Sequence, residues 1–169
     1  MTFNRDVHHR RSIRLPDYDY SRGGAYFVTL CAWQHKCFFA EIVDGERQLS
    51  AVGQIAHQTW EWLGDQYDHV QLDEWVVMPN HLHGIIVINE GRNAKAGGLK
   101  SLGRLIGAFK TVSTKRINEL RHSLGSVVWQ RNYYERVIRN EHELAGTREY
   151  IVNNPMKWEL DKENPINRP

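Results

Sequence analysis

The feature that most constrains the fold is a pair of apolar, β-branched runs at residues 70–77 and 81–88, separated by a short Met-Pro-Asn segment. Such runs predict strands, and the Pro79-Asn80 dipeptide predicts a bend or turn between them. His81 and His83 stand two residues apart in the second run, so both imidazoles should project from one face. Two neutral imidazoles on a rigid sheet form half of a site for a divalent cation. The alternative is two histidines on a sheet face exposed to solvent.

The remaining periodicity completes one recognisable order of elements. Strands are predicted at residues 26–33 and 127–138, and helices at 50–66, 99–120 and 141–153. Strand, helix, two strands, helix and strand, followed by a further helix, is the split βαβ order of ferredoxin-like folds. We therefore predict an α+β fold, with an antiparallel sheet, helices packed on one face, the other face free for ligands, and an additional C-terminal helix that carries Tyr150.

The chain has 169 residues, and its length and hydropathy indicate a single domain with a segment on each side. Residues 1–24 form a basic arm, residues 25–158 the domain, and residues 159–169 a C-terminal tail, while residues 89–98 are predicted as a mobile loop. The longest apolar runs fall far short of the roughly 20 residues that a membrane span needs. No apolar segment of signal-peptide type follows the basic arm. We therefore expect a cytoplasmic protein with no membrane partner.

The last predicted helix places a phenol and an amide on one face. Tyr150 and Asn154 are four residues apart, and Pro155 ends the helix. One interpretation is structural, with the tyrosine packed at a helix–sheet seam and the asparagine capping the helix. The other is chemical, because a nearby cation that polarises a phosphodiester would make attack by a phenol feasible.

The net charge is only +2, so nucleic-acid binding would depend on local basic clusters. One of these clusters, residues 131–139, surrounds two tyrosines that could stack on bases, although such charges are more often solvated side chains than specific contacts. The candidate DNA contacts are Arg10, Arg11, Arg14, Lys110, Arg131, Tyr133 and Arg136.

Only two cysteines are present, Cys31 and Cys37, which excludes a disulfide framework. We expect both to be reduced, and we expect Cys31 to lie in a strand with its side chain in the hydrophobic core. A metal site built on this Cys-x5-Cys pair is the alternative.

Three blocks follow one another along the chain: WVVMPNHLHG at 75–84, VWQRNYYERVIRN at 128–140 and EYIVNNPMKW at 149–158. Together with the entry strand GGAYFVT at 23–29, they resemble the single-tyrosine HUH transposases, most closely the REP-associated tyrosine transposases. The resemblance covers roughly residues 18–158. It implies a ferredoxin-like endonuclease and strand transferase that cuts single-stranded DNA through a 5′-phosphotyrosine intermediate and leaves a 3′-hydroxyl.

Matched by position, the resemblance implies Tyr150 as the nucleophile and His81 and His83 as the metal-binding pair. Asn154 falls on the third ligand, where the mobile-element branch typically has glutamine. Imidazole ligation by itself tolerates manganese, cobalt, nickel or zinc more readily than magnesium. The resemblance implies Mg²⁺ or Mn²⁺.

The implied partner is single-stranded or hairpin DNA, with the N-terminal arginines on the hairpin stem and the other basic residues along the strand. Both a homodimer and a monomer occur among such relatives. Two other functions stay open from the residues alone. One is a metal-dependent hydrolase of small substrates, and the other is a nucleic-acid-binding protein without catalytic activity.

Overall fold

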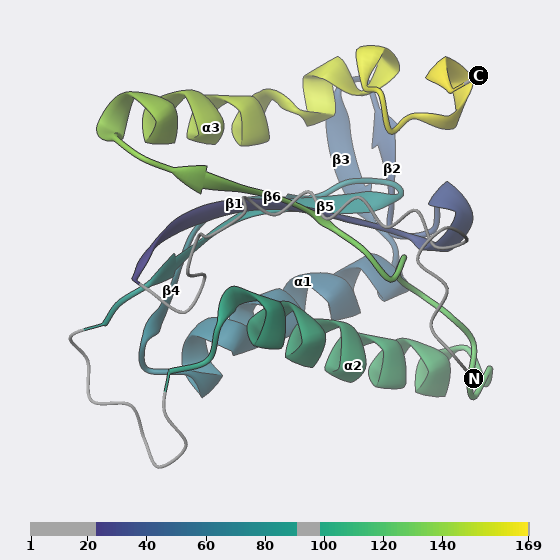
Figure 1. The fold of residues 1–169 in the computed structure, drawn as a ribbon. Coiled ribbons are helices and arrows are strands. Elements are labelled where there is room, and N and C mark those ends of the chain that lie inside the picture. The colour runs from purple at the N-terminus through teal and green to yellow at the C-terminus, as the bar shows by residue number, and fades with distance from the viewer. Residues whose placement is uncertain (1–22, 91–98, 169) are drawn as a thin grey trace, which may run out of the picture.

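The computed structural model of the chain describes residues 23–90 and 99–168, which build a four-stranded sheet with helices on both faces (Figure 1). The strands are β1 (Gly24–Cys31), β4 (Val70–Val77), β5 (His81–Ile88) and β6 (Tyr134–Ile138). Their order is β4-β5-β1-β6, and every neighbouring pair is antiparallel. This order confirms the predicted ferredoxin-like α+β fold. Most of the predicted mobile loop lies outside the described residues.

Two helices, α1 (Ala51–Gln66) and α2 (Leu102–Leu120), cover one face of the sheet, and α3 (Glu141–Asn153) lies over the other (Figure 1). The predicted first helix is confirmed by the span of α1. Its N-cap is Ser50, whose hydroxyl accepts from the N–H of Gly53. The second helix begins three residues later than predicted, after Ser101. Within the described residues, none of the helices combines the length and the apolar character that crossing a membrane requires.

Alternation along the two central strands divides the core between these layers. Tyr26, Val28 and Leu82 belong to the larger core cluster, which includes the buried faces of α1 and α2. The intervening side chains, among them Phe27 and Ile85, pack with Ile151 of α3 in a second, smaller cluster. The face expected to be free for ligands is therefore partly covered by α3. His81 and His83 belong to the same alternating set as Ile85, so both imidazoles face the α3 layer.

Short elements that the sequence pattern did not predict surround this framework. They are the hairpin β2 (Ala40–Val43) and β3 (Glu46–Leu49), and the 3-10 helices η1 (Trp33–His35), η2 (Pro155–Leu160) and η3 (Pro165–Asn167). The hairpin turns at Asp44-Gly45, where both residues have positive φ, of 53° and 77°.

The predicted strand at residues 127–138 is only partly formed. Its first half makes one isolated bridge, between Trp129 and Ala32, and regular pairing begins at Tyr134. The Trp129 indole instead donates to the Ser113 hydroxyl of α2 at 2.9 Å. Trp129 therefore packs beside α2 as part of the larger core cluster.

Candidate active site and metal centre

The two histidines of β5 form a compact, buried pair. Their ring centroids lie 4.4 Å apart, at an interplanar angle of 63°. Exposed fractions of 0% for His81 and 1% for His83 rule out the alternative of a solvent-exposed sheet face. Burial lowers the pKa of His81 to about 4 and that of His83 well below its ordinary value. Both rings are therefore neutral near pH 7, the state in which imidazole binds a metal.

Asn80 fixes the proton on the ring of His81. Its side-chain nitrogen donates to the carbonyl oxygens of His35 and Glu163, at 3.1 and 2.7 Å. Its oxygen therefore faces Nδ1 of His81, 2.9 Å away, and must accept the N–H from that nitrogen. The lone pair of His81 is left on Nε2, which is buried and has no hydrogen-bond partner. The turn residue Asn80 thus orients a potential metal ligand, a role that its position in a predicted turn did not suggest.

Thr29 stands on the other side of the pair. It lies opposite His83 in the β1–β5 register, and its hydroxyl is 2.9 Å from Nδ1 of His83. When that hydroxyl accepts the Nδ1 proton, Nε2 of His83 presents a lone pair in the same layer as Nε2 of His81.

Tyr150 of α3 approaches this lone pair from the same chain. Its hydroxyl lies 3.3 Å from Nε2 of His83, and its ring is 40% exposed. α3 begins at the N-cap Asn140, whose side chain accepts from Glu143, and Arg148 joins it to the edge strand β4 through two hydrogen bonds to Asp73, of 2.7 and 2.6 Å. Burial, followed by the negative charge of Asp161, raises the pKa of Tyr150. The phenol is therefore protonated near neutral pH.

Asn154 and Asp161 complete the surroundings of the pair. Asn154 is 3% exposed, and its Oδ1 is buried without a hydrogen-bond partner. Its amide partly opposes the effect of burial, which lowers the pKa of His81 and raises that of Tyr150. Asp161 brings Oδ2, also buried and without a hydrogen bond, to 3.8 Å from Nε2 of His81. Ligand atoms of His81, His83 and Asp161 lie within 4.8 Å of one another.

Asp161 is a candidate ligand that sequence reasoning missed. It lies in the segment predicted as a tail, among other acidic residues and with no spacing that relates it to the histidines. Only the fold shows that this segment turns back over the sheet through η2, which buries Asp161, Glu163 and Asn164.

The predicted DNA contacts fall in different places. Arg136 lies beside Tyr150, in a pocket of about 400 Å³ that Phe27 and Thr147 also line. Lys110 instead donates to the carbonyl oxygens of residues 130, 131 and 132, and burial lowers its pKa to about 8.

Two other predicted contacts lie close to the Lys110 amine. The centroid of the Tyr133 ring lies 5.3 Å from the Lys110 nitrogen. Arg131 contacts this amine through its backbone carbonyl, at 3.2 Å, and is an exposed residue. Arg10, Arg11 and Arg14 lie outside the described residues.

Comparison with known proteins places the chain in a family. Residues 52–154 match the family model for IS200-like transposases. An uncharacterised protein of Haemophilus influenzae is 38% identical over 174 aligned positions, which cover 95% of this chain and 96% of the relative. A second protein of that organism, provisionally named a REP-associated tyrosine transposase, is 25% identical over 82% of this chain and 74% of its own length.

The fold is also that of a solved structure, described as a REP-associated tyrosine transposase bound to a REP hairpin. The TM-score is 0.61 at 18% identity, with 89% of this chain and 77% of the other covered. These matches confirm the resemblance to REP-associated tyrosine transposases. Because the family model covers more than half of its length, the chain belongs to the IS200-like transposase family.

Proposed function

We propose that this chain is a metal-dependent endonuclease and strand transferase that cuts single-stranded DNA beside a hairpin, through a 5′-phosphotyrosine intermediate. The observation that carries the proposal is the 3.3 Å contact between the Tyr150 hydroxyl and Nε2 of His83, at the rim of a buried histidine pair. Membership of the IS200-like transposase family supports it. Because both groups belong to one chain, a single protomer holds the nucleophile and the histidine pair together.

The chemistry assigns one role to the tyrosine. The Tyr150 oxygen attacks the phosphorus, the bond from phosphorus to the 3′ oxygen breaks, and the DNA 5′ phosphate becomes esterified to the phenol. The phenolic proton passes to solvent, and the departing 3′ oxygen takes up a proton. The phosphotyrosine ester retains the energy needed to rejoin DNA, so the proposed reaction needs no nucleotide.

The donor set fits a divalent cation. Nε2 of His81, Oδ2 of Asp161 and Oδ1 of Asn154 are buried without hydrogen-bond partners, and buried polar atoms of this kind are rarely left unsatisfied. We propose that His81, His83 and Asn154 hold Mg²⁺ or Mn²⁺, with Asp161 as a further ligand. A bound cation would polarise the phosphate and stabilise the charge that develops on it.

Arg136 supports a DNA path beside the tyrosine. Its guanidinium donates to the Thr147 hydroxyl at 2.8 Å and is exposed next to Tyr150, where it can contact a phosphate flanking the scissile one. The solved relative bound to a REP hairpin supports a hairpin substrate. We propose that Arg10, Arg11 and Arg14 contact the hairpin stem, and that Arg131, Tyr133 and Lys110 lie along the strand path. Affinity should then fall steeply with salt.

The test uses labelled hairpin DNA with single-stranded flanks in Mn²⁺. Wild type should form a covalent adduct that survives denaturation, and Tyr150→Phe should form none. Tyr134→Phe is a matched control, because both rings are 40% exposed and stand edge-on to Phe27 at similar distances, 6.2 Å for Tyr134 and 6.0 Å for Tyr150. An adduct that persists in Tyr150→Phe, or that fails to form on every hairpin tested, would refute the mechanism.

One observation favours a second candidate, a metal-dependent hydrolase of small phosphodiesters. His81, His83 and Asp161 supply two imidazoles and one carboxylate, a set that could hold a cation with bound water. Hydrolysis of a chromogenic phosphodiester at an undiminished rate by Tyr150→Phe would favour this candidate. DNA binding by all variants without either reaction would favour a binding protein that lacks catalytic activity.

A further inference from the structure

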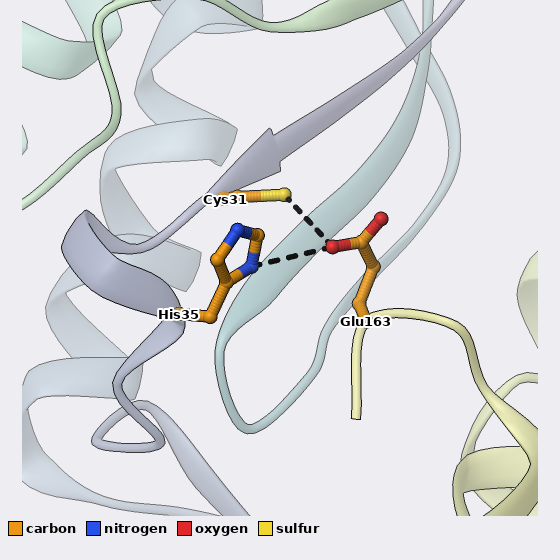
Figure 2. Close-up of side chains that lie close together, drawn as sticks. All are labelled: Cys31, His35 and Glu163. Carbon is orange, nitrogen blue, oxygen red and sulfur yellow. Dashed lines mark hydrogen bonds and ion pairs between the residues drawn. The ribbon is translucent and has the colours of Figure 1, made fainter. Parts of the chain in front are cut away.

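A second group of side chains that could ligate a metal lies at the end of β1, apart from the histidine pair. Cys31 ends β1, His35 ends η1 and Glu163 comes from the C-terminal segment (Figure 2). Oε2 of Glu163 lies 3.6 Å from Sγ of Cys31 and 3.3 Å from Nδ1 of His35. All three ligand atoms lie within 4.8 Å of one another. Figure 2 shows both side chains pointing at the same carboxylate oxygen.

These separations fit the dimensions of a tetrahedral zinc site. With ordinary zinc–ligand bond lengths, tetrahedral geometry places sulfur and oxygen about 3.5 Å apart and nitrogen and oxygen about 3.3 Å apart. The distances in the structure, 3.6 and 3.3 Å, differ from these values by only about a tenth of an ångström. Two of the three ligand separations are therefore those of a four-coordinate zinc site.

Contacts on both ring nitrogens and an uncommon backbone conformation distinguish His35. The side-chain nitrogen of Gln130 lies 2.6 Å from Nε2 and donates to it, so the ring proton is on Nδ1, which is buried and faces Oε2 of Glu163 at 3.3 Å. The backbone is left-handed at Gln34 and at His35, with φ of 55° and 52°, although neither residue is glycine. Such a conformation costs free energy and is typical of residues at functional sites.

We propose that Cys31, His35 and Glu163 form a binding site for a thiophilic divalent cation of the zinc class, separate from the histidine pair of the active site. Thiolate and imidazole ligands favour zinc and cobalt over magnesium. When the ion binds, the Cys31 thiol, which now donates to Glu163, loses its proton to the solvent. The ring proton of His35 moves from Nδ1 to Nε2, and the Gln130 amide turns so that its oxygen accepts this proton. Arg168 pairs with Oε2 of Glu163 at 2.6 Å, so the ion would have to displace this guanidinium from that oxygen. A water molecule would supply the fourth ligand.

An ion at this site would fix the position of the C-terminal segment. Glu163 lies two residues after Asp161, whose Oδ1 accepts the backbone N–H of Glu163 at 2.7 Å. Cys31 is paired with His81 across β1 and β5. An ion bound to Glu163 would therefore hold Asp161 beside His81, and would join the C-terminal segment to the first strand.

Cobalt provides the direct test, because a thiolate bound to Co²⁺ gives an intense near-ultraviolet charge-transfer band. Wild-type protein titrated with Co²⁺ should show this band with one equivalent per chain. Cys31→Ser and His35→Ala should lose it, and Glu163→Gln should weaken cobalt binding at least about tenfold. Cys37→Ser is the matched control, since that cysteine is exposed and outside the group.

A His83→Ala variant separates this site from the active site. The charge-transfer band should persist in His83→Ala. In the same variant, amide hydrogen exchange in residues 159–168 should be slower with Co²⁺ bound than without it. No charge-transfer band in wild type, or a band that survives Cys31→Ser, would overturn the proposal. So would a band that disappears in a folded His83→Ala protein. None of these outcomes depends on DNA cleavage.

Discussion

The hydroxyl of Thr29 lies 2.9 Å from Nδ1 of His83, and the two residues face each other directly across β1 and β5. Thr29→Val keeps the shape of the side chain and removes the hydroxyl that orients this ring. We expect the affinity for Mn²⁺ to fall about tenfold, as is usual when the partner of a metal-binding histidine is lost. Isothermal titration calorimetry measures this change.

Thr111→Val is the control for Thr29→Val, because Thr111 is an exposed residue of α2 whose hydroxyl bonds only the carbonyl of Gly107 among the contacts described. Its Mn²⁺ affinity should match that of wild type. Equal affinities for all three proteins would show that Thr29 does not orient His83.

Asp161→Asn tests the carboxylate that the fold brings to His81. The asparagine keeps an oxygen to accept the Glu163 N–H, but it turns an NH₂ group toward Nε2 of His81, which would occupy the lone pair that we propose binds a cation. Mn²⁺ affinity should fall at least about tenfold. Asp65→Asn, at an exposed position of α1, should leave it unchanged. If Asp161→Asn also binds as tightly as wild type, Asp161 is not a ligand, and Asn154→Ala becomes the variant to measure.

The sequence predicted the fold and the main elements of the candidate site because their signals are local. An apolar, β-branched run predicted β5, and positions two residues apart within it predicted that His81 and His83 share a face, which the structure confirms. Helical spacing placed Tyr150 and Asn154 together. The role of each side chain in catalysis or metal binding stays a prediction.

Contacts that depend on how the chain returns over the sheet could not be predicted in this way. The position of Asp161 next to His81, and of Glu163 next to Cys31, depends on the path of η2, which no periodicity encodes. The β2–β3 hairpin was missed because its strands have only four residues each, too few for alternation to be distinguished from a loop.

Gly84, directly after the histidine pair, is required by packing. A Cβ atom there would overlap Cζ2 of the buried Trp60 ring, so Gly84→Ala must displace either the ring or β5. We expect the free energy of unfolding to fall by about 1–3 kcal/mol. Gly107→Ala is the matched control, because nothing lies within 4 Å of its added methyl group and it sits inside α2. That variant should be more stable by about 0.5–1 kcal/mol. Urea unfolding of both variants checks the contrast, and equal effects would contradict it.

Burial of His81 also predicts how stability depends on pH. Its pKa falls from 6.5 to about 4 on folding, chiefly because burial disfavours the charged ring. Above pH 6.5 neither state binds the proton, so this contribution to stability is complete. As the pH falls from 6.5 toward 4, the unfolded chain binds the proton and the folded chain does not, so the free energy of unfolding decreases.

Between about pH 7.5 and about pH 5, His81 alone should account for a loss of about 2 kcal/mol. His81→Gln cannot titrate, so its unfolding free energy should decline less than that of wild type by this amount. The measurement is urea unfolding at both pH values, with chelator present so that metal binding does not contribute. His142→Gln serves as the control, because His142 is exposed on α3 and should leave the wild-type pH dependence unchanged. A decline in His81→Gln as steep as that of wild type would show that His81 is not the buried neutral group responsible.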